Sequence, residues 1–341
     1  MRPFAYSRPD DVATAVRMAT PPMPKAIAPT SAPAQFIAGG TLILDLMKLD
    51  TMRPERLVDI NGLAPALGAI QSGPHALRLG ALVRMSQLAD DATVNRDYPV
   101  IAQTMQLAAA AQLRNMASLG GNVLQRTRCQ YFRDPSWQQC NKRHPGSGCA
   151  ALGGVNRKHA VLGVSDTCIA EYPGDFAQAL VALGASVETQ GPAGARTIPF
   201  ERLHRGPDTP DVETVLNPGE LITGFVVPAG PWTRRSAYLK VRDRQSYAFA
   251  LASAAVALDM DGDTVREARI GLGGVAYRPW RAHEAEAALK GKRLDAATAT
   301  AAARAAFAGA RPHEHNAYKV DLGQRTLVRA LLQVGRMEMP A

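Results

Sequence analysis

Four cysteines are the residues of this sequence with the clearest capacity for chemistry. The chain has 341 residues, and its cysteines are Cys129, Cys140, Cys149 and Cys168, spaced C-x10-C-x8-C-x18-C. All four lie in the segment Gln125–Cys168, which is rich in proline and glycine and has neither helical nor strand periodicity. Such a stretch is too long for a plain loop in a compact domain. We therefore expect something other than a hydrophobic core to order it.

The spacing leaves four interpretations of the cysteines open. Structural zinc usually takes its ligands from close C-x2-4-C pairs, and this sequence has none. Two disulfides or four unrelated thiols remain possible. A [4Fe–4S] cluster also fits, because separate loops can supply its four thiolates one at a time. Basic residues that could offset the cluster's negative charge and raise its potential interleave with the cysteines: Arg126, Arg128, Arg133, Lys142, Arg143, Arg157 and Lys158. The residues favour the cluster without excluding the others.

Two glycine pairs form a second set of chemical signals. Ala38-Gly39-Gly40-Thr41-Leu42 follows a predicted strand, and Ser118-Leu119-Gly120-Gly121-Asn122 follows a predicted helix. Each could present bare backbone N–H groups and a hydroxyl to a phosphate. Neither matches G-x-G-x-x-G or a Walker A loop, which disfavours a Rossmann site or a P-loop hydrolase. Alone, each pair is more typical of a simple turn, but together they could hold a pyrophosphate from two sides.

Two charged residues have a structural and a functional interpretation. Asp175 stands at the start of a predicted helix, where a helix N-cap is the simplest reading. Lys240 stands in a predicted strand, where an exposed strand charge is the simplest reading. On local grounds the structural interpretation is favoured for both, and a functional role depends on the whole pattern.

The elements that must position these residues form three units. The first is a small α/β unit with a strand over Gln35–Ala38, a helix over Leu42–Lys48 and a strand over Leu57–Ile60. The second has two strands and two helices in the order Leu77–Ala81, a long alanine-rich helix over Ile101–Met116, a helix over Asp175–Leu183, and Glu220–Val227.

The third unit follows a linker rich in proline and glycine at Pro228–Pro231. Alternating patterns at Ala237–Asp259 and Val265–Val275, with the hairpin signal Asp261-Gly262-Asp263, predict antiparallel strands. Three helices are predicted after them, at His283–Leu289, Ala296–Ala308 and Leu322–Val334. The sequence therefore predicts an α+β unit, with strands backed by helices.

Composition and charge exclude several classes. The net charge is +9, but lysines and arginines are dispersed, with no basic run and no interleaved aromatic residues, so nucleic acid is not the expected partner. No apolar stretch reaches the roughly 20 residues of a membrane span. The first residues, Met1–Pro9, have no apolar core behind their charges, so we expect no signal peptide in this chain.

Five motifs together resemble one known family, and the resemblance covers essentially the whole chain. Phe36–Thr41, Leu57–Asn61, Leu79–Ala81, Leu119–Asn122 and Pro218–Ile222 resemble the FAD-binding subunit of the xanthine dehydrogenase and carbon monoxide dehydrogenase family. The resemblance implies an α+β fold with a two-part FAD-binding domain at residues 1–62 and 63–230, the second part carrying an iron–sulfur insertion at 125–168. A C-terminal flavoprotein domain at 231–341, with antiparallel strands backed by helices, would complete it.

The cysteine segment narrows the resemblance within the family. Most members run from the Gly-Gly-Asn motif directly into the helix start found here at Pro173–Asp175, whereas this chain interposes residues 125–168. The inserted text is similar to the flavin and [4Fe–4S] subunit of bacterial periplasmic aldehyde oxidoreductases, which implies that Cys129, Cys140, Cys149 and Cys168 ligate one [4Fe–4S] cluster. Hydroxybenzoyl-CoA reductases also carry such a loop, so they remain the alternative.

The resemblance also implies flavin contacts. Thirteen residues would surround the FAD pyrophosphate: Gln35, Phe36, Ile37, Ala38, Gly39, Gly40, Thr41, Leu42 and Ile43 from the first glycine turn, and Ser118, Gly120, Gly121 and Asn122 from the second. Asp175 would accept hydrogen bonds from the ribityl chain or ring edge. Lys240 would stabilise the anionic reduced ring, and Ile222 would pack on the ring. Gly174 replaces the commoner serine, which removes one hydroxyl.

The implied function is electron transfer within a heterotrimer. A large subunit would oxidise an aldehyde to a carboxylic acid at a molybdenum cofactor, and a small subunit would carry two [2Fe–2S] clusters. This chain would pass their electrons through FAD to an external acceptor, with no substrate-oxidising residue of its own. Periplasmic location by co-export with a partner that bears a twin-arginine signal is expected, with the cytoplasm as the alternative. A zinc-binding interaction protein is the non-redox alternative.

Overall fold

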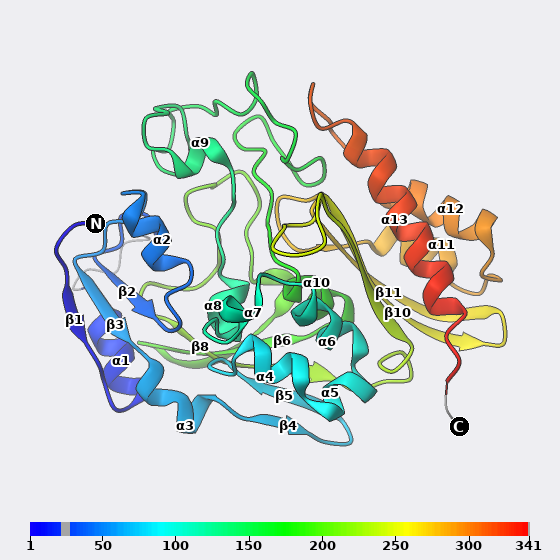
Figure 1. Cartoon of the computed structure of the whole chain (residues 1–341), viewed down its shortest axis with the longest axis horizontal. Coiled ribbons are helices and arrows are strands. Elements are labelled where there is room, and N and C mark those ends of the chain that lie inside the picture. The colour runs from blue at the N-terminus through cyan, green and yellow to red at the C-terminus, as the bar shows by residue number, and fades with distance from the viewer. Residues whose placement is uncertain (22–27, 340–341) are drawn as a thin grey trace.

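Three sheets with their helices lie one after another along the long axis of the molecule (Figure 1). The structure is a computed structural model, and it describes residues 1–21 and 28–339. The chain passes from a small parallel sheet, through a five-stranded antiparallel sheet, to a four-stranded antiparallel sheet with three helices on one face. The expected α+β class is confirmed.

The first unit is a three-stranded parallel sheet in the order β1 (Ala5–Ser7), β3 (Arg56–Asp59), β2 (Ala34–Ile37). Helix α1 (Val12–Ala19) buries Ala15, Val16 and Ala19 against it. The core of this unit is completed by Leu82 and Leu221, which belong to the second unit. Helix α2 (Ile43–Lys48) follows the first glycine turn, so the predicted strand, turn, helix and strand are confirmed.

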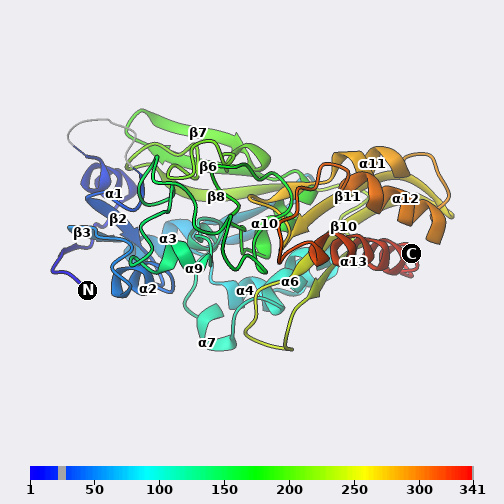
Figure 2. The same ribbon diagram turned by 90° about the horizontal axis from the view of Figure 1, so that it is seen from above.

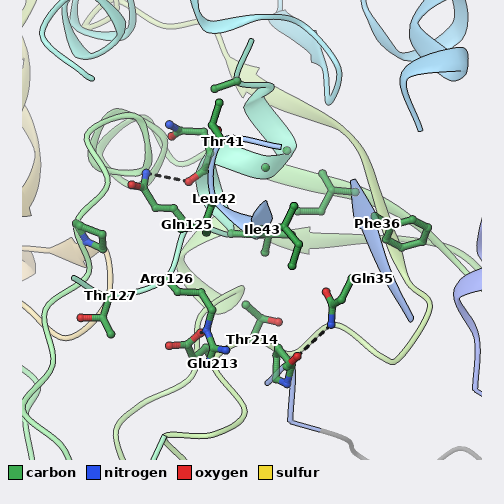
Figure 3. Close-up of a pocket in the computed structure, with 18 of the residues that line it drawn as sticks. Gln35, Phe36, Thr41, Leu42, Ile43, Gln125, Arg126, Thr127, Glu213 and Thr214 are labelled. Carbon is green, nitrogen blue, oxygen red and sulfur yellow. Dashed lines mark hydrogen bonds and ion pairs between the residues drawn. The ribbon is translucent and has the colours of Figure 1, made fainter. Parts of the chain in front are cut away.

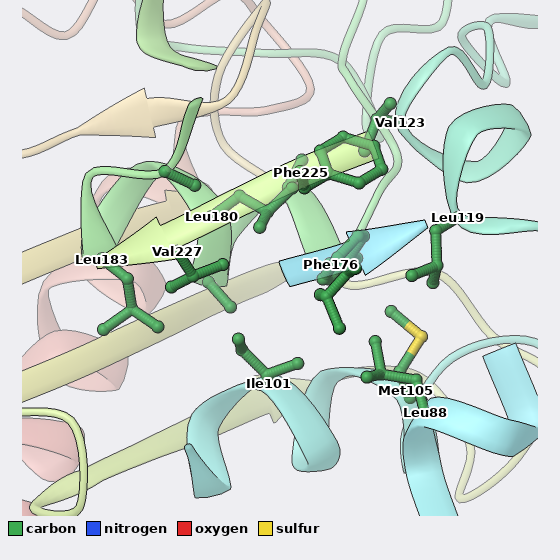
Figure 4. Packing of buried hydrophobic residues seen from close by; sticks show 14 of the residues in the cluster. Leu88, Ile101, Met105, Leu119, Val123, Phe176, Leu180, Leu183, Phe225 and Val227 are labelled. Atoms are coloured by element: carbon green, nitrogen blue, oxygen red, sulfur yellow. The ribbon is translucent and has the colours of Figure 1, made fainter. Parts of the chain in front are cut away.

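The second unit is an antiparallel sheet whose strands run β4 (Ile70–Ser72), β5 (Ala76–Gly80), β8 (Leu221–Pro228), β6 (Ser186–Gly191) and β7 (Gly194–Pro199). Helix α10 (Phe176–Leu183) is buried along its whole length. In Figure 4, Phe176 and Leu180 of this helix pack beside Phe225 of β8, with Ile101 and Met105 beneath them. Because the helix has no polar face, it serves as the centre of the core.

Short helices surround this core: α3 (Ala64–Leu67), α4 (Met85–Asp90), α5 (Ala92–Asp97), α6 (Pro99–Gln106), α7 (Ala111–Arg114), α8 (Leu119–Val123) and α9 (Gln130–Arg133), with 3-10 turns η1 (Asn61–Leu63) and η2 (Phe200–Arg202).

The predicted long helix over Ile101–Met116 is wrong, because the chain breaks it between α6 and α7. Ala109 adopts a left-handed backbone with φ of 49°. The carbonyl of Leu107 accepts hydrogen bonds from Lys240 Nζ (3.1 Å) and Arg242 Nη1 (2.9 Å). Cations from a distant strand thus satisfy and stabilise the end of α6, which alanine-rich composition could not reveal.

The third unit has the sheet order β12 (Trp280–Arg281), β11 (Thr264–Gly273), β10 (Ala252–Asp261), β9 (Ser236–Val241). The β10–β11 hairpin turns at Gly262, where φ is 55°. Helices α11 (His283–Leu289), α12 (Ala296–Ala306) and α13 (Tyr318–Gly335) cover one face of this sheet (Figures 1 and 2). The predicted helices are confirmed, and α13 begins four residues earlier than predicted.

The cysteine segment is irregular, as predicted. The expectation that no hydrophobic core orders it is wrong, because Phe132 packs with Leu46 and Met52, and Tyr131 packs with Ala151 and Ile169. The segment's one helix among the described elements is α9, and it lies above the second unit in Figure 1. Among the described residues no helix combines the length and apolar character needed to cross a bilayer.

Candidate functional site

A cavity of about 1700 Å³ lies where the three units and the cysteine segment meet. Small-ligand pockets typically measure roughly 300–1,000 Å³, so this one has room for an extended cofactor. Figure 3 shows part of its lining, with residues of the first glycine turn, the cysteine segment and the loop before β8 around one space.

The residues expected to contact FAD converge on this cavity. All of them except Ile37 line it: Gln35, Phe36, Ala38, Gly39, Gly40, Thr41, Leu42, Ile43, Ser118, Gly120, Gly121, Asn122, Asp175, Ile222 and Lys240. Their individual contacts with the flavin stay predictions, but the chain brings them to one place from all three units.

The first glycine turn presents free donors. Gly40 has a φ of 72°, which favours glycine. The backbone N–H groups of residues 39–43 donate to no acceptor among the described residues. A run of such groups ahead of α2 is suited to an anion. This is the property that a pyrophosphate site requires.

The second glycine pair does not have this property, and the prediction of bare N–H groups there is wrong. It forms the first turn of α8, with Ser118 as N-cap accepting from Gly121 N at 3.3 Å. The N–H groups of Leu119, Gly120 and Asn122 donate to carbonyls at 2.8–3.0 Å. The Ser118 hydroxyl and the Asn122 side chain are the groups this turn can still offer a ligand. The carboxamide oxygen of Asn122 has no partner among the described residues.

The two glycine segments are held against each other. A side chain on Gly39 would overlap the carbonyl oxygen of Met116. Asn61 Nδ2 donates to the carbonyl of Ala38 at 2.9 Å, and its Oδ1 accepts from Arg84 Nη2 at 2.7 Å. Arg84 Nη1 donates in turn to Met116 O. This network fixes one wall of the cavity.

Asp175 and Lys240 form a buried ion pair, with 2.7 Å between Lys240 Nζ and Asp175 Oδ2. Their side chains are 5% and 1% exposed, and Tyr238 donates its hydroxyl to Asp175 at 2.5 Å. Asp175 makes no capping hydrogen bond to α10. Both local interpretations, an N-cap and an exposed strand charge, are therefore wrong. The two residues lie together at the cavity wall as a neutral pair.

The four cysteines also converge. Cys140 and Cys149 face each other across an isolated antiparallel bridge, and the neighbouring Cys168 thiol lowers the pKa of the Cys149 thiol to about 6. Burial raises the pKa of the Cys129 thiol to about 12, and the nearby Cys140 and Cys149 add to the effect. The backbone of Ala151, Ile169 and Leu152 also acts to lower the pKa of Cys149. All four are free thiols.

This arrangement is not a formed metal site. Within residues 1–21 and 28–339, no three His, Cys, Asp or Glu side chains stand close enough to hold a metal ion. The donor set is still of the type that an iron–sulfur cluster takes, because four free thiols, two of them buried, lie in one segment. Cys129 is the cysteine that also lines the large cavity, where His159 Nε2 lies 3.2 Å from its sulfur.

Three functional candidates were missed as a group by the sequence reasoning. Glu213 Oε2 accepts from Arg126 Nε and Glu213 Oε1 accepts from Lys142 Nζ, each at 2.6 Å. Burial opposes ionisation, but the two cations lower the pKa of Glu213 to about 2. Arg126 and Lys142 had been noted as basic residues of the cysteine segment. Nothing in the sequence marks Glu213 as their partner.

A second buried pair was also missed. Lys319, fully buried on α13, donates to Glu171 Oε2 at 2.6 Å and to the carbonyl of Gly274 at 2.7 Å. Glu171 lines the cavity, and its burial raises its pKa to about 7. The C-terminal helix therefore helps to build the site.

Comparison with known protein families identifies the class of protein to which this fold and cavity belong. Residues 2–230 match the FAD binding domain in molybdopterin dehydrogenase, and residues 237–334 match the CO dehydrogenase flavoprotein C-terminal domain. The chain belongs to this family of FAD-binding subunits of molybdenum-dependent oxidoreductases.

Its relatives within the family include an aldehyde oxidoreductase subunit. The chain is 47% identical over 303 residues to the aldehyde oxidoreductase FAD-binding subunit PaoB of Escherichia coli K12, covering 88% of this chain and 91% of that protein. It is 29% identical to the carbon monoxide dehydrogenase medium chain of Afipia carboxidovorans, over 86% and 81% of the two chains. Carbon monoxide dehydrogenase from Hydrogenophaga pseudoflava superimposes with a TM-score of 0.73 at 27% identity, over 97% and 96% of the chains.

Proposed function

We propose that this chain is the FAD and [4Fe–4S] electron-transfer subunit of a heterotrimeric molybdenum-containing aldehyde oxidoreductase. The observation that supports it is the 47% identity to an aldehyde oxidoreductase FAD-binding subunit over nearly the whole chain. FAD supplies one- and two-electron chemistry when bound. The chain's own residues would hold and orient it, and the unused N–H groups of residues 39–43 would be available to the pyrophosphate.

The partners belong to the same proposal. A small subunit with two [2Fe–2S] clusters would donate electrons to this chain, and a large molybdenum subunit would convert aldehyde to carboxylic acid. The cavity supports passage to an external acceptor, because its rim carries exposed side chains such as Tyr247 and Phe249, which are 58% and 45% exposed.

The [4Fe–4S] cluster would be ligated by Cys129, Cys140, Cys149 and Cys168. Its support is the gathering of all the chain's cysteines in one irregular segment, with Cys129 also on the cavity wall. Ligation would replace the thiol protons and order the segment, because metal binding and folding are coupled. Cys129 would then stand between the cluster and the flavin.

The test is to produce the three subunits together and analyse this chain. We expect stoichiometric FAD, about four iron atoms per chain beyond those of the partner, and an EPR signal on reduction. Cys149→Ser should lose that signal and keep FAD. Stoichiometric zinc, or two disulfides in freshly isolated protein, would refute the cluster while leaving the flavin assignment intact.

The periplasmic location is a separate part of the proposal. The chain would leave the cytoplasm already folded, together with the small subunit bearing a twin-arginine signal. Fractionation of cells that express the chain with and without that partner tests it. Flavoprotein in the periplasm without the partner, or wholly in the cytoplasm with the complete assembly, would contradict co-export.

A further inference from the structure

One buried cluster of charged side chains at the cavity wall has more positive than negative charges. Glu213 is shared by Arg126 and Lys142, so one carboxylate faces two cations and the cluster holds one net positive charge. The side chains of both cations are 4% exposed. No other Asp or Glu of the described residues pairs with either of them, and residues 22–27 and 340–341 contain none.

The unmet hydrogen-bonding capacity of this cluster is concentrated on Arg126. Lys142 Nζ donates to Glu213, to the carbonyl of Pro210 at 3.2 Å and to the Tyr277 hydroxyl at 2.9 Å, so its three donors are used. Arg126 Nη1 and Nη2 are buried and have no acceptor among the described residues. A buried guanidinium in this state is costly, and an anionic acceptor would relieve both the charge and the donors.

The position of Arg126 in the cavity indicates which anion it would bind. Arg126 follows α8 by three residues and lines the same cavity as the first glycine turn, and Figure 3 shows it with Thr41, Leu42 and Ile43 around the pocket. That turn offers neutral N–H groups on one side. The N–H groups of α8, which would have completed the other side, already donate inside the protein.

The other cations around the cavity are less suited. Arg196 pairs with Glu220, and Lys158, Arg205 and Arg244 are exposed. Lys240 is matched one to one with Asp175, and Arg157 is paired with Asp243 at the exposed rim. Arg128 and Arg133 each have one buried nitrogen without a partner, but they share Asp45, and their side chains are 31% and 22% exposed, so solvent screens their charges more than that of Arg126.

We propose that Arg126, held by Glu213 and stacked on the Phe132 ring at 4.7 Å, binds the diphosphate of FAD opposite the first glycine turn. The guanidinium fork matches phosphate oxygens in a two-point hydrogen bond. Glu213 and Lys142 are positioning residues that fix the fork and set the net charge. The inference rests on FAD binding by this family and on the unpartnered Nη1 and Nη2 donors of Arg126, because the positive charge alone would also suit the proposed [4Fe–4S] cluster.

The experiment measures binding of FAD, ADP and riboflavin to the full chain after removal of its flavin. Arg126→Gln should weaken FAD and ADP at least tenfold, equal to about 1.4 kcal/mol, and leave riboflavin within about twofold. Glu213→Gln should also weaken FAD and ADP, but by less than Arg126→Gln, because the guanidinium loses the carboxylate that fixes it and keeps its own charge. A merely structural role would weaken riboflavin binding along with FAD and ADP.

Two control variants separate a specific effect of Arg126 on FAD binding from effects of overall charge and of misfolding. Arg157→Gln removes the same charge from the exposed rim and should change FAD binding little. Arg126→Lys keeps the charge without the fork and should lie between wild type and Arg126→Gln; it also carries the test if Arg126→Gln fails to fold. Unchanged FAD affinity in the Arg126 variants, or an equal loss for riboflavin, would overturn the assignment.

Discussion

Removing the charge of Lys240 should destabilise the protein far more than an ordinary surface substitution. Its ion pair with Asp175 has 2.7 Å between the charged atoms, and both side chains are buried. Lys240→Met leaves Asp175 with the Tyr238 hydroxyl as its remaining side-chain partner. Breaking one side of a buried pair costs roughly 3–5 kcal/mol, so for a chain of 341 residues we expect a drop in melting temperature of about 4–7 °C.

The assay is thermal unfolding of the flavin-free chain with three variants. Lys240→Met/Asp175→Asn removes both charges and should recover more than half of the loss, because no buried charge is then left unpaired. Arg157→Met breaks an exposed pair with Asp243 and should cost less than about 1 kcal/mol. The reasoning fails if Lys240→Met melts within about 2 °C of wild type, or if the double variant is no more stable than the single one. The reduction potential of the bound flavin can be measured in the same three variants after FAD is restored. It shows whether the Lys240 cation acts on the flavin directly or only as half of a neutral pair with Asp175.

Three further predictions follow from the geometry. Gly39→Ala should lower FAD affinity about tenfold or more because its methyl would push the Met116 carbonyl away, whereas Gly309→Ala, which lies outside the cavity lining with open space around its Cβ, should bind FAD normally; equal affinities would contradict the close approach. Burial lowers the pKa of His204 from 6.5 to about 4. The stability that neutral His204 contributes is therefore complete above pH 6.5 and is lost, by about 3 kcal/mol, as the pH falls toward 4. Between pH 7.5 and 4.5 the melting temperature should fall more with decreasing pH for wild type than for His204→Gln. Lys319→Met should destabilise the chain less at pH 6 than at pH 8, since its partner Glu171, with a pKa raised to about 7, is then largely protonated; the same loss at both pH values would count against this pairing.

Periodicity and turn chemistry were enough to predict most elements. The hairpin at Gly262 and helices such as α10 and α11 follow from local pattern, because their apolar residues repeat at the period of the element. The gathering of the glycine turns, Asp175 and Lys240 at one cavity was expected through the family resemblance, and all but Ile37 of those residues line it.

The failures share one physical cause, which is contact between distant parts of the chain. The break after α6 depends on cations of β9 and the residues after it, 133 positions or more away. The second glycine pair looks like a free turn until the carbonyls of Ala81 and Val83 are brought to its N–H groups. Glu213 can be recognised as a site residue only from its ion pairs with Arg126 and Lys142. None of these partners is adjacent in sequence, so no local pattern could have revealed them.

The link between Asn61, Arg84 and Met116 has a consequence for the exchange of parts among relatives. The core of the first unit includes Leu82 and Leu221 of the second unit, and these hydrogen bonds connect the first unit to the segment just before α8. A chimaera that takes its first 62 residues from another family member must therefore match position 84 and the backbone at 116, and must keep glycine at 39. Whether such hybrids retain the flavin should depend on these contacts between the first and second units. Useful crossover points therefore lie where they leave these contacts intact.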